Sequence, residues 1–185
     1  MTSTETPTLT GTWTADAVHS DVSFKVRHMA VGKARGKFDL ADSTLTVGED
    51  GLAGASVVAT IDATSVDTNN EQRDQHVHSP DFLHTAQYPT LTFRSTGVRS
   101  LKGDDFLLDG ELTIRDTTKP VTLEVEHLGA TVDAYGADRV GFTATTSISR
   151  KEYGVSFEAA FGAGNAVVAD KVEITLELEY VRAQA

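Results

Sequence analysis

The chain has 185 residues, 39% of them hydrophobic and 23% charged, which is typical of one soluble globular domain. Its formal net charge is −11 at pH 7, which disfavours nucleic acid and anionic membrane surfaces as partners, because both are negatively charged. Cysteine is absent, which excludes disulfides, thiolate metal sites and cysteine nucleophiles.

The N-terminal sequence, MTSTETPTLTGTWT, lacks the basic start and apolar run of a secretory signal. No stretch approaches about 18 consecutive apolar residues, so stable membrane insertion is not expected. We therefore expect a cytoplasmic protein. Residues 1–9 are predicted to form a flexible tail, and residues 10–182 a single domain.

Four strands are predicted in the first third of the chain, near residues 13–18, 22–29, 34–47 and 53–61. Their apolar residues alternate with polar ones, as Val22, Phe24 and Val26 do. This period of two places the apolar side chains on one face of each strand.

The segment 67–89 lacks this alternation and predicts a short helical insertion at about 68–86. Thr68 followed by Glu71 matches a capping box at the start of one helix. Ser79-Pro80-Asp81 matches the start of a second, with a cap residue followed by proline. We therefore expect two short helices that cover one end of the fold.

Five further strands are predicted, near residues 91–98, 106–115, 118–132, 139–149 and 167–181. The last gives the clearest signal, because apolar and polar residues alternate without exception from Val172 to Tyr180. The connections are too short for parallel crossovers, so neighbouring strands should be antiparallel. About eight amphipathic strands that must bury one face and protect their edges predict an all-β, extended antiparallel eight-stranded barrel; a sandwich is the alternative.

His76 and His78 have a spacing that could bind a metal ion, but their local structure argues against it. On a strand both rings would point the same way, whereas on a helix they diverge by about 200°. Because the capping signals favour helix, we expect no metal site. We expect instead that Arg73, Asp74 and the two histidines fasten the insertion, with Asp74 and His78 as an i,i+4 pair. A metalloprotein or enzyme that uses His76 and His78 stays as the alternative.

The remaining candidates for catalysis are weak. His19-Ser20-Asp21 contains the residue types of a hydrolase triad, but adjacent residues cannot adopt triad geometry. Gly162-Ala163-Gly164-Asn165 leads into a strand, where a dinucleotide-binding loop would lead into a helix, so it predicts a turn. We therefore expect no enzyme and no cofactor.

The barrel interior is the remaining candidate site. An eight-stranded barrel has room for packed side chains or for one small ligand, and periodicity fits both. A filled barrel would make the chain an interaction module. Phe82 and Leu83, in the insertion, are expected to close over the interior. The predicted inward-facing residues of the other segments are Phe24, Val26, Phe38, Ile61, Phe93, Leu108, Ile114, Val125, Phe142, Ile148 and Phe157.

Four sequence blocks, taken together, resemble a known family. They are WTADAVHSDVSFKVRH with GKARGKFDL, VDTNNEQRDQHVHSPDFLHTAQYPTLTFRS, LDGELTIRDTTKPVTLEVEHLG, and VGFTATTSISRKEYGVSF. In this order and spacing, from about Trp13 to Tyr180, the chain resembles the YceI-like family of lipocalin-like, polyisoprenoid-binding proteins.

The resemblance implies a lipocalin-like barrel with a long internal tunnel and no catalytic activity. It implies binding, transport or storage of a polyprenyl chain, an isoprenoid quinone or a fatty-acid-like amphiphile as the partner, and a possible homodimer. The apolar residues above, with Phe82 and Leu83, would then line the tunnel. His19, Arg115, Lys119 and Arg150 are the candidates for binding a polar head group at its mouth.

Overall fold

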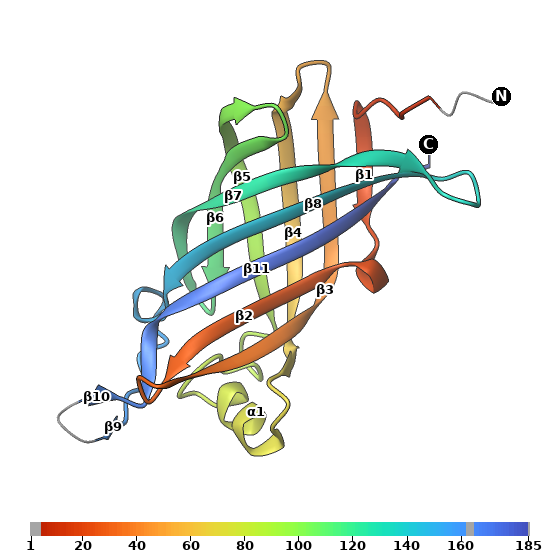
Figure 1. Cartoon of the computed structure of the whole chain (residues 1–185). Coiled ribbons are helices and arrows are strands. Elements are labelled where there is room, and N and C mark those ends of the chain that lie inside the picture. Colours follow the sequence, from red (N-terminus) through yellow and green to blue (C-terminus); the bar gives the residue numbers. More distant parts are fainter. Residues whose placement is uncertain (1–4, 162–164, 185) are drawn as a thin grey trace.

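Strands make up most of residues 5–161 and 165–184, which the computed structural model describes (Figure 1). The strands are β1 (Gly11–Ala15), β2 (Asp21–His28), β3 (Gly32–Gly48), β4 (Gly51–Asp67), β5 (Thr90–Lys102), β6 (Asp105–Ile114), β7 (Thr117–Val132), β8 (Asp138–Ser149), β9 (Ala160–Phe161), β10 (Asn165–Ala166) and β11 (Val168–Arg182). The helical elements of this part are η1 (Ala17–His19), α1 (Glu71–His78) and η2 (Arg150–Tyr153).

Within the described residues, eight long strands close into an antiparallel barrel (Figure 1). The ring runs β2-β3-β4-β5-β6-β7-β8-β11, and β11 closes it by pairing with both β8 and β2. A closed ring removes the free edges that an open sheet would present to other chains. The predicted eight-stranded antiparallel barrel is confirmed.

Strand β1 shares one position of the ring with β2. Trp13 of β1 pairs with Leu45 of β3 on one side and with Arg182 of β11 on the other. Strand β2 pairs with other stretches of the same two strands. The turn η1 separates the two strands because the Asp16 side chain caps it, accepting a hydrogen bond from the Val18 N–H at 3.1 Å. Nine predicted strands thus fill eight barrel positions.

Two features of the strands differ from the sequence-based expectation. Strand β4 continues to Asp67, six residues beyond its predicted end, because it keeps pairing with β3 at Lys37. The short hairpin of β9 and β10 was not predicted. The turn predicted at Gly162-Ala163-Gly164-Asn165 falls largely on residues 162–164, which lie outside the described residues.

The insertion contains one helix where two were predicted. Helix α1 begins after Asn70, whose side chain accepts the Arg73 N–H at 2.9 Å, so Asn70 and not Thr68 is its N-cap. The second predicted helix, starting at Ser79, is wrong: residues 79–87 form turns. Ser79 ends α1 instead, because its backbone N–H and its hydroxyl both donate to the His76 carbonyl. We call residues 68–86 the cap; it lies at one end of the barrel (Figure 1).

The other end of the barrel is packed with side chains. Trp13 is fully buried there, its Nε1 donates to the Leu9 carbonyl at 2.8 Å, and the Arg182 guanidinium lies 4.3 Å from the centre of its ring. Val47 and Val140 pack in the same cluster. Of the predicted N-terminal tail, residues 1–4 lie outside the described residues, whereas Leu9 packs against this cluster.

Candidate ligand-binding cavity

The barrel encloses a cavity of about 770 Å³. Ligand-binding pockets typically measure about 300–1,000 Å³. The interior is therefore hollow, in contrast to the filled-barrel alternative. Every apolar residue predicted to face the interior lines this cavity: Phe24, Val26, Phe38, Ile61, Phe82, Leu83, Phe93, Leu108, Ile114, Val125, Phe142, Ile148 and Phe157.

A buried polar pair lies within the largely apolar lining. The hydroxyl groups of Ser43 and Tyr180 lie 2.8 Å apart, and both residues are almost fully buried. Burial raises the pKa of Tyr180, so its hydroxyl stays neutral at physiological pH. A hydroxyl can donate one hydrogen bond and accept two, so the pair retains capacity for a ligand oxygen.

The wall formed by β2 and β3 owes its shape to a glycine. Phe24 pairs with Gly36 across the two strands, and its ring lies over the glycine. A Cβ at position 36 would lie 2.4 Å from Phe24 Cζ and 2.9 Å from Thr68 Cγ2, so any larger residue must displace the ring. Phe38 packs against Phe24 with ring centroids 5.3 Å apart. The two rings form an aromatic section of the cavity wall.

The end of the cavity beneath the cap carries polar side chains. Asn70, Gln72 and Arg73 of the cap line the cavity there, and Arg27 and His28 of β2 line it as well. Sequence reasoning did not place these five residues on the cavity, although it expected Arg73 to fasten the insertion. The signal that could have identified them was the polar insertion between two strands, which places polar groups across a barrel end.

Thr68, the first residue of the cap and the residue directly after β4, anchors helix α1. The Arg73 guanidinium donates to the Thr68 hydroxyl at 2.8 Å and to its carbonyl at 2.6 Å. The Asp74 carboxylate accepts from the backbone N–H of Thr68 at 2.8 Å and from its hydroxyl. The predicted Asp74–His78 pair is wrong, because Asp74 is engaged by Thr68 and His78 lies 2.9 Å from the Thr85 hydroxyl.

His76 holds the cap over the cavity. Its Nε2 lies 2.8 Å from the Asp81 carboxylate, and its ring packs edge-on against Phe82 and Phe157, with centroids 4.9 Å and 4.8 Å away. His78 is bonded to Thr85 instead, so the two histidines have separate partners. This is the divergence that a helix imposes on residues two apart.

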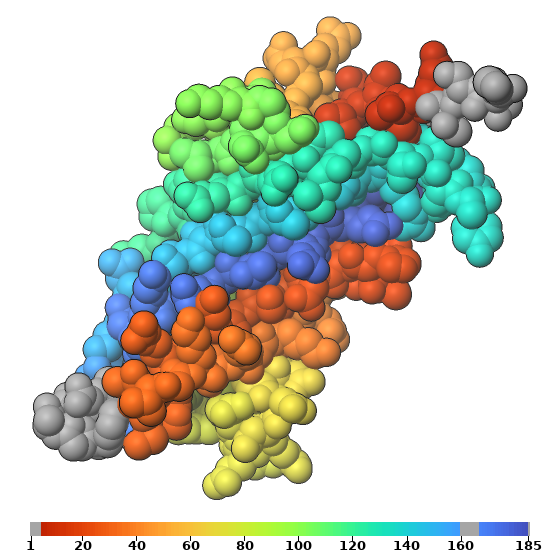
Figure 2. Space-filling model, viewed as in Figure 1, coloured from red at the N-terminus to blue at the C-terminus, as the bar shows by residue number. Residues whose placement is uncertain are grey.

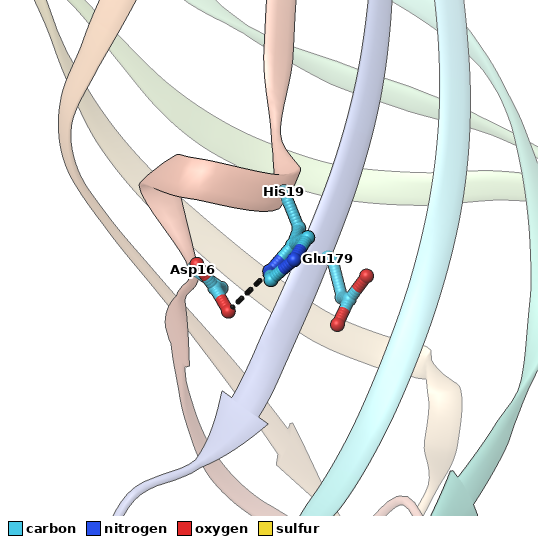
Figure 3. A group of neighbouring side chains, drawn as sticks. All are labelled: Asp16, His19 and Glu179. Carbon is cyan, nitrogen blue, oxygen red and sulfur yellow. Dashed lines mark hydrogen bonds and ion pairs between the residues drawn. The ribbon is translucent and has the colours of Figure 1, made fainter. Parts of the chain in front are cut away.

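Among the described residues, one group has three side chains that could together approach a metal ion: Asp16, His19 and Glu179 (Figure 3). His19 Nδ1 lies 2.8 Å from Asp16 Oδ2. Arg139 already provides a cation here, since its NH1 donates to Asp16 at 2.8 Å and to Glu179 at 2.5 Å. Its guanidinium, followed by His19, holds the pKa of Asp16 well below the usual range, and Asp16 raises the pKa of His19. The group therefore forms an ion-pair network on the barrel.

The four predicted head-group residues occupy different surroundings. His19, Arg115 and Lys119 are not among the residues that line the cavity. Arg115 donates to the carbonyls of Phe82 and Gly154 at 3.3 Å and 3.4 Å, and thus joins the cap to the segment after η2. Arg150 does line the cavity, but it is 5% exposed and its guanidinium donates to four main-chain carbonyls, those of Val155, Phe157, Val168 and Ala169.

These features define a class of protein: a lipocalin-like antiparallel barrel with a hollow apolar interior and a helical cap. Several solved structures share the fold. BcnA of Burkholderia cenocepacia aligns with a TM-score of 0.75 at 24% identity, covering 89% of this chain and 98% of BcnA. A polyisoprenoid binding domain from Saccharophagus degradans aligns with a TM-score of 0.64 at 18% identity, covering 92% of this chain and 98% of that domain.

The sequence comparisons identify the family. A sequence model of the YceI-like domain matches residues 13–180. Protein YceI of Escherichia coli O17:K52:H18 is 42% identical over 137 residues, which cover 74% of this chain and 71% of that protein. The chain therefore belongs to the YceI-like family. None of the helices in the described part of the chain has the length and apolar character needed to span a bilayer.

Proposed function

We propose that the chain binds, transports or stores a polyisoprenoid or a similar long-chain amphiphile in its barrel cavity, without catalysing a reaction. The observation that carries this proposal is the cavity of about 770 Å³, whose lining is predominantly aliphatic and aromatic. The description of the Saccharophagus degradans domain as polyisoprenoid binding supports it by analogy. An isoprenoid quinone, a polyprenyl chain or a fatty-acid derivative has the required chemistry.

The energetics of burial favour a long apolar chain. Each buried methylene contributes about 0.8 kcal/mol, so ten contribute about 8 kcal/mol. Association costs about 4–15 kcal/mol, so a chain of ten carbons barely offsets it. A longer chain adds burial, and a preformed cavity lowers the ordering cost. The apolar wall residues, such as Phe24 and Phe142, would supply this burial.

The polar head group of such a ligand would lie beneath the cap. Arg27, His28, Gln72 and Arg73 provide hydrogen-bond donors at that end, whereas the opposite end offers the Ser43–Tyr180 pair. Of the head-group residues predicted from sequence, Arg150 is the one on the cavity, and its donors already serve carbonyl groups. We therefore assign the head group to the cap end and the apolar tail to the barrel.

Native mass spectrometry of the purified chain, combined with extraction of bound lipid, tests this proposal. We expect one lipid per cavity, either co-purified or after addition of geranylgeraniol or a ubiquinone. If the folded protein binds neither in a stoichiometric amount, the carrier proposal fails. A stoichiometric metal, lost when His76 and His78 are both changed, would favour the metalloprotein alternative. The homodimer and the cytoplasmic location stay predictions, which the same mass spectra and cell fractionation can address.

A further inference from the structure

The hairpin of β2 and β3 concentrates positive charge in an acidic chain. The chain has 16 lysine and arginine residues and a net charge of −11, yet five of the 16 lie within residues 25–37, where no acidic residue occurs. We call this segment the cationic hairpin. Its five cations are Lys25, Arg27, Lys33, Arg35 and Lys37.

Four of these cations, Lys25, Lys33, Arg35 and Lys37, lie on the outer face of the barrel, because the residues that alternate with them, such as Val26 and Ala34, line the cavity. Arg27, near the end of β2, lines the cavity beneath the cap. Lys25 pairs across the strands with Arg35, and Arg27 pairs with Lys33. Like charges placed directly opposite destabilise a sheet. Among the described residues the one ion pair of this group is Lys25 with Glu173, at 3.8 Å, so Lys33, Arg35 and Lys37 are available to a partner on the outer face.

The tip of the cationic hairpin is apolar and strained. Met29 and Ala30 both have positive φ, 50° and 61°, as in a type I′ turn, for which Asn-Gly is the favoured sequence. A non-glycine residue in this region costs about 1–3 kcal/mol, so the sequence places apolar residues where they are unfavourable. Val31, next to them, is 94% exposed. An exposed apolar tip between two rows of cations matches the interface of an anionic bilayer.

The cationic hairpin stands next to the mouth of the cavity. Arg27 and His28 line the cavity, as do several residues of the cap. The Met29 N–H donates to the Val167 carbonyl at 2.9 Å, which ties the tip to the residue just before β11. Figure 2 shows the orange hairpin at the end of the molecule that also carries the yellow cap. A membrane bound by this hairpin would therefore face the opening of the cavity.

We propose that the cationic hairpin docks the protein, reversibly and without insertion, on an anionic phospholipid bilayer. The phosphate groups complement the three free cations, Lys33, Arg35 and Lys37, and Met29 and Val31 reach the boundary between head groups and acyl chains. Asp21 and Asp39 mark the two ends of the positively charged stretch, and the chain as a whole has a net charge of −11. An anionic bilayer repels this negative charge, so contact through the cationic hairpin is favoured over contact through other faces. Docking does not require a bound lipid, so this proposal and the carrier proposal can fail separately.

Vesicle flotation of the full chain tests the docking. We compare phosphatidylcholine vesicles with vesicles that also contain phosphatidylglycerol, and expect binding to the latter that weakens as salt is added. Each cation near an anionic surface is worth about fivefold in partitioning, so Lys33→Glu with Arg35→Glu should lower binding at least about 25-fold. The control, Arg94→Glu with Lys102→Glu on β5, makes the same change in net charge at exposed positions. If both double variants bind like the parent, or lose binding equally while remaining folded, the proposal is overturned.

A fluorescent label locates the contact. Because the chain has no cysteine, Val31→Cys and Tyr135→Cys can each carry one environment-sensitive dye. Both positions are highly exposed, at 94% and 97%. We expect a blue shift of the dye at position 31, and none at position 135, on phosphatidylglycerol-containing vesicles. Equal shifts at the two positions, or no shift at either, would contradict the proposal. Binding of the hairpin to duplex DNA without binding to vesicles would contradict it as well.

Discussion

The imidazole ring of His76 packs edge-on against the phenyl ring of Phe157, with centroids 4.8 Å apart. His76 belongs to the cap and Phe157 to the segment after η2, so this contact joins two parts of the chain across the cavity mouth. Phe82 completes the cluster, 5.3 Å from Phe157. These contacts hold the cap by side-chain packing and not by strand pairing.

Replacing His76 should loosen the cap. His76→Ala removes two aromatic contacts and the bond to Asp81, and aromatic pairs contribute about 0.5–1.5 kcal/mol each. We expect the dissociation rate of a bound fluorescent fatty acid to rise about two- to tenfold, and the α1 amides to exchange faster with or without ligand. Gln75→Ala, an exposed position on the same helix, is the control and should leave both rates unchanged. Unchanged exchange in His76→Ala would show that the cluster does not hold the cap.

Gly36 should tolerate no side chain. In Gly36→Ala the new Cβ would overlap the Phe24 ring, and overpacking of this kind costs about 1–3 kcal/mol in the free energy of unfolding. Denaturant unfolding measures this cost. Gly48→Ala is the matched control on the same strand, because no heavy atom lies within 4 Å of a Cβ placed there. Equal stability of the two variants would mean that the Phe24 ring does not rest on Gly36.

The Ser43–Tyr180 pair should show coupled energetics. Ser43→Ala leaves the buried Tyr180 hydroxyl without its partner, which costs about 1–3 kcal/mol. Tyr180→Phe leaves the Ser43 hydroxyl in the same position. We expect the double variant to be more stable than the sum of the two single losses predicts, which a double-mutant cycle of unfolding free energies measures. Strict additivity would show that the two hydroxyls do not interact.

Ion pairs on the barrel surface should make its stability sensitive to acid. Arg99, followed by Thr122, lowers the pKa of Asp109 from 3.8 to about 2. A carboxyl whose pKa is lower in the folded protein than in the unfolded chain stabilises the folded state at pH values above the unfolded pKa. This contribution is lost as the pH falls from about 4 to about 2. Arg99→Gln should therefore lower stability at neutral pH and flatten its decline over that interval. Arg94→Gln, on the same strand, should retain the parent's pH profile; an unchanged profile in Arg99→Gln would contradict the assignment.

The strands were predictable from sequence because each buries one face. The alternation from Val172 to Tyr180 persists in β11, and the apolar residues chosen from such patterns all line the cavity. The hollow interior was not predictable in this way, because a side chain such as Phe142 can face packed neighbours or an empty space with the same periodicity. Cavity volume depends on barrel geometry, which periodicity does not specify.

The details of the cap were less accessible, because several residues compete for the same backbone groups. Thr68, Asn70 and Ser79 are all good cap residues in isolation. In the structure Thr68 binds Arg73 and Asp74, which leaves Asn70 to begin α1 and Ser79 to end it. The cationic hairpin was missed for another reason: the total charge of −11 conceals a local excess of lysine and arginine.

Two adjacent positions on β4 allow the most direct test of the binding cavity. Ala59 lines the cavity, whereas Val58 is 49% exposed on the outer face. Calorimetric titration with geranylgeraniol would compare the parent with Ala59→Trp, which fills the cavity, and Val58→Trp, which adds the same group outside. We predict saturable one-to-one binding by the parent and by Val58→Trp, and at least about tenfold weaker binding by a folded Ala59→Trp. Equal affinities for all three, or no saturable binding by the folded parent, would contradict a ligand-binding cavity.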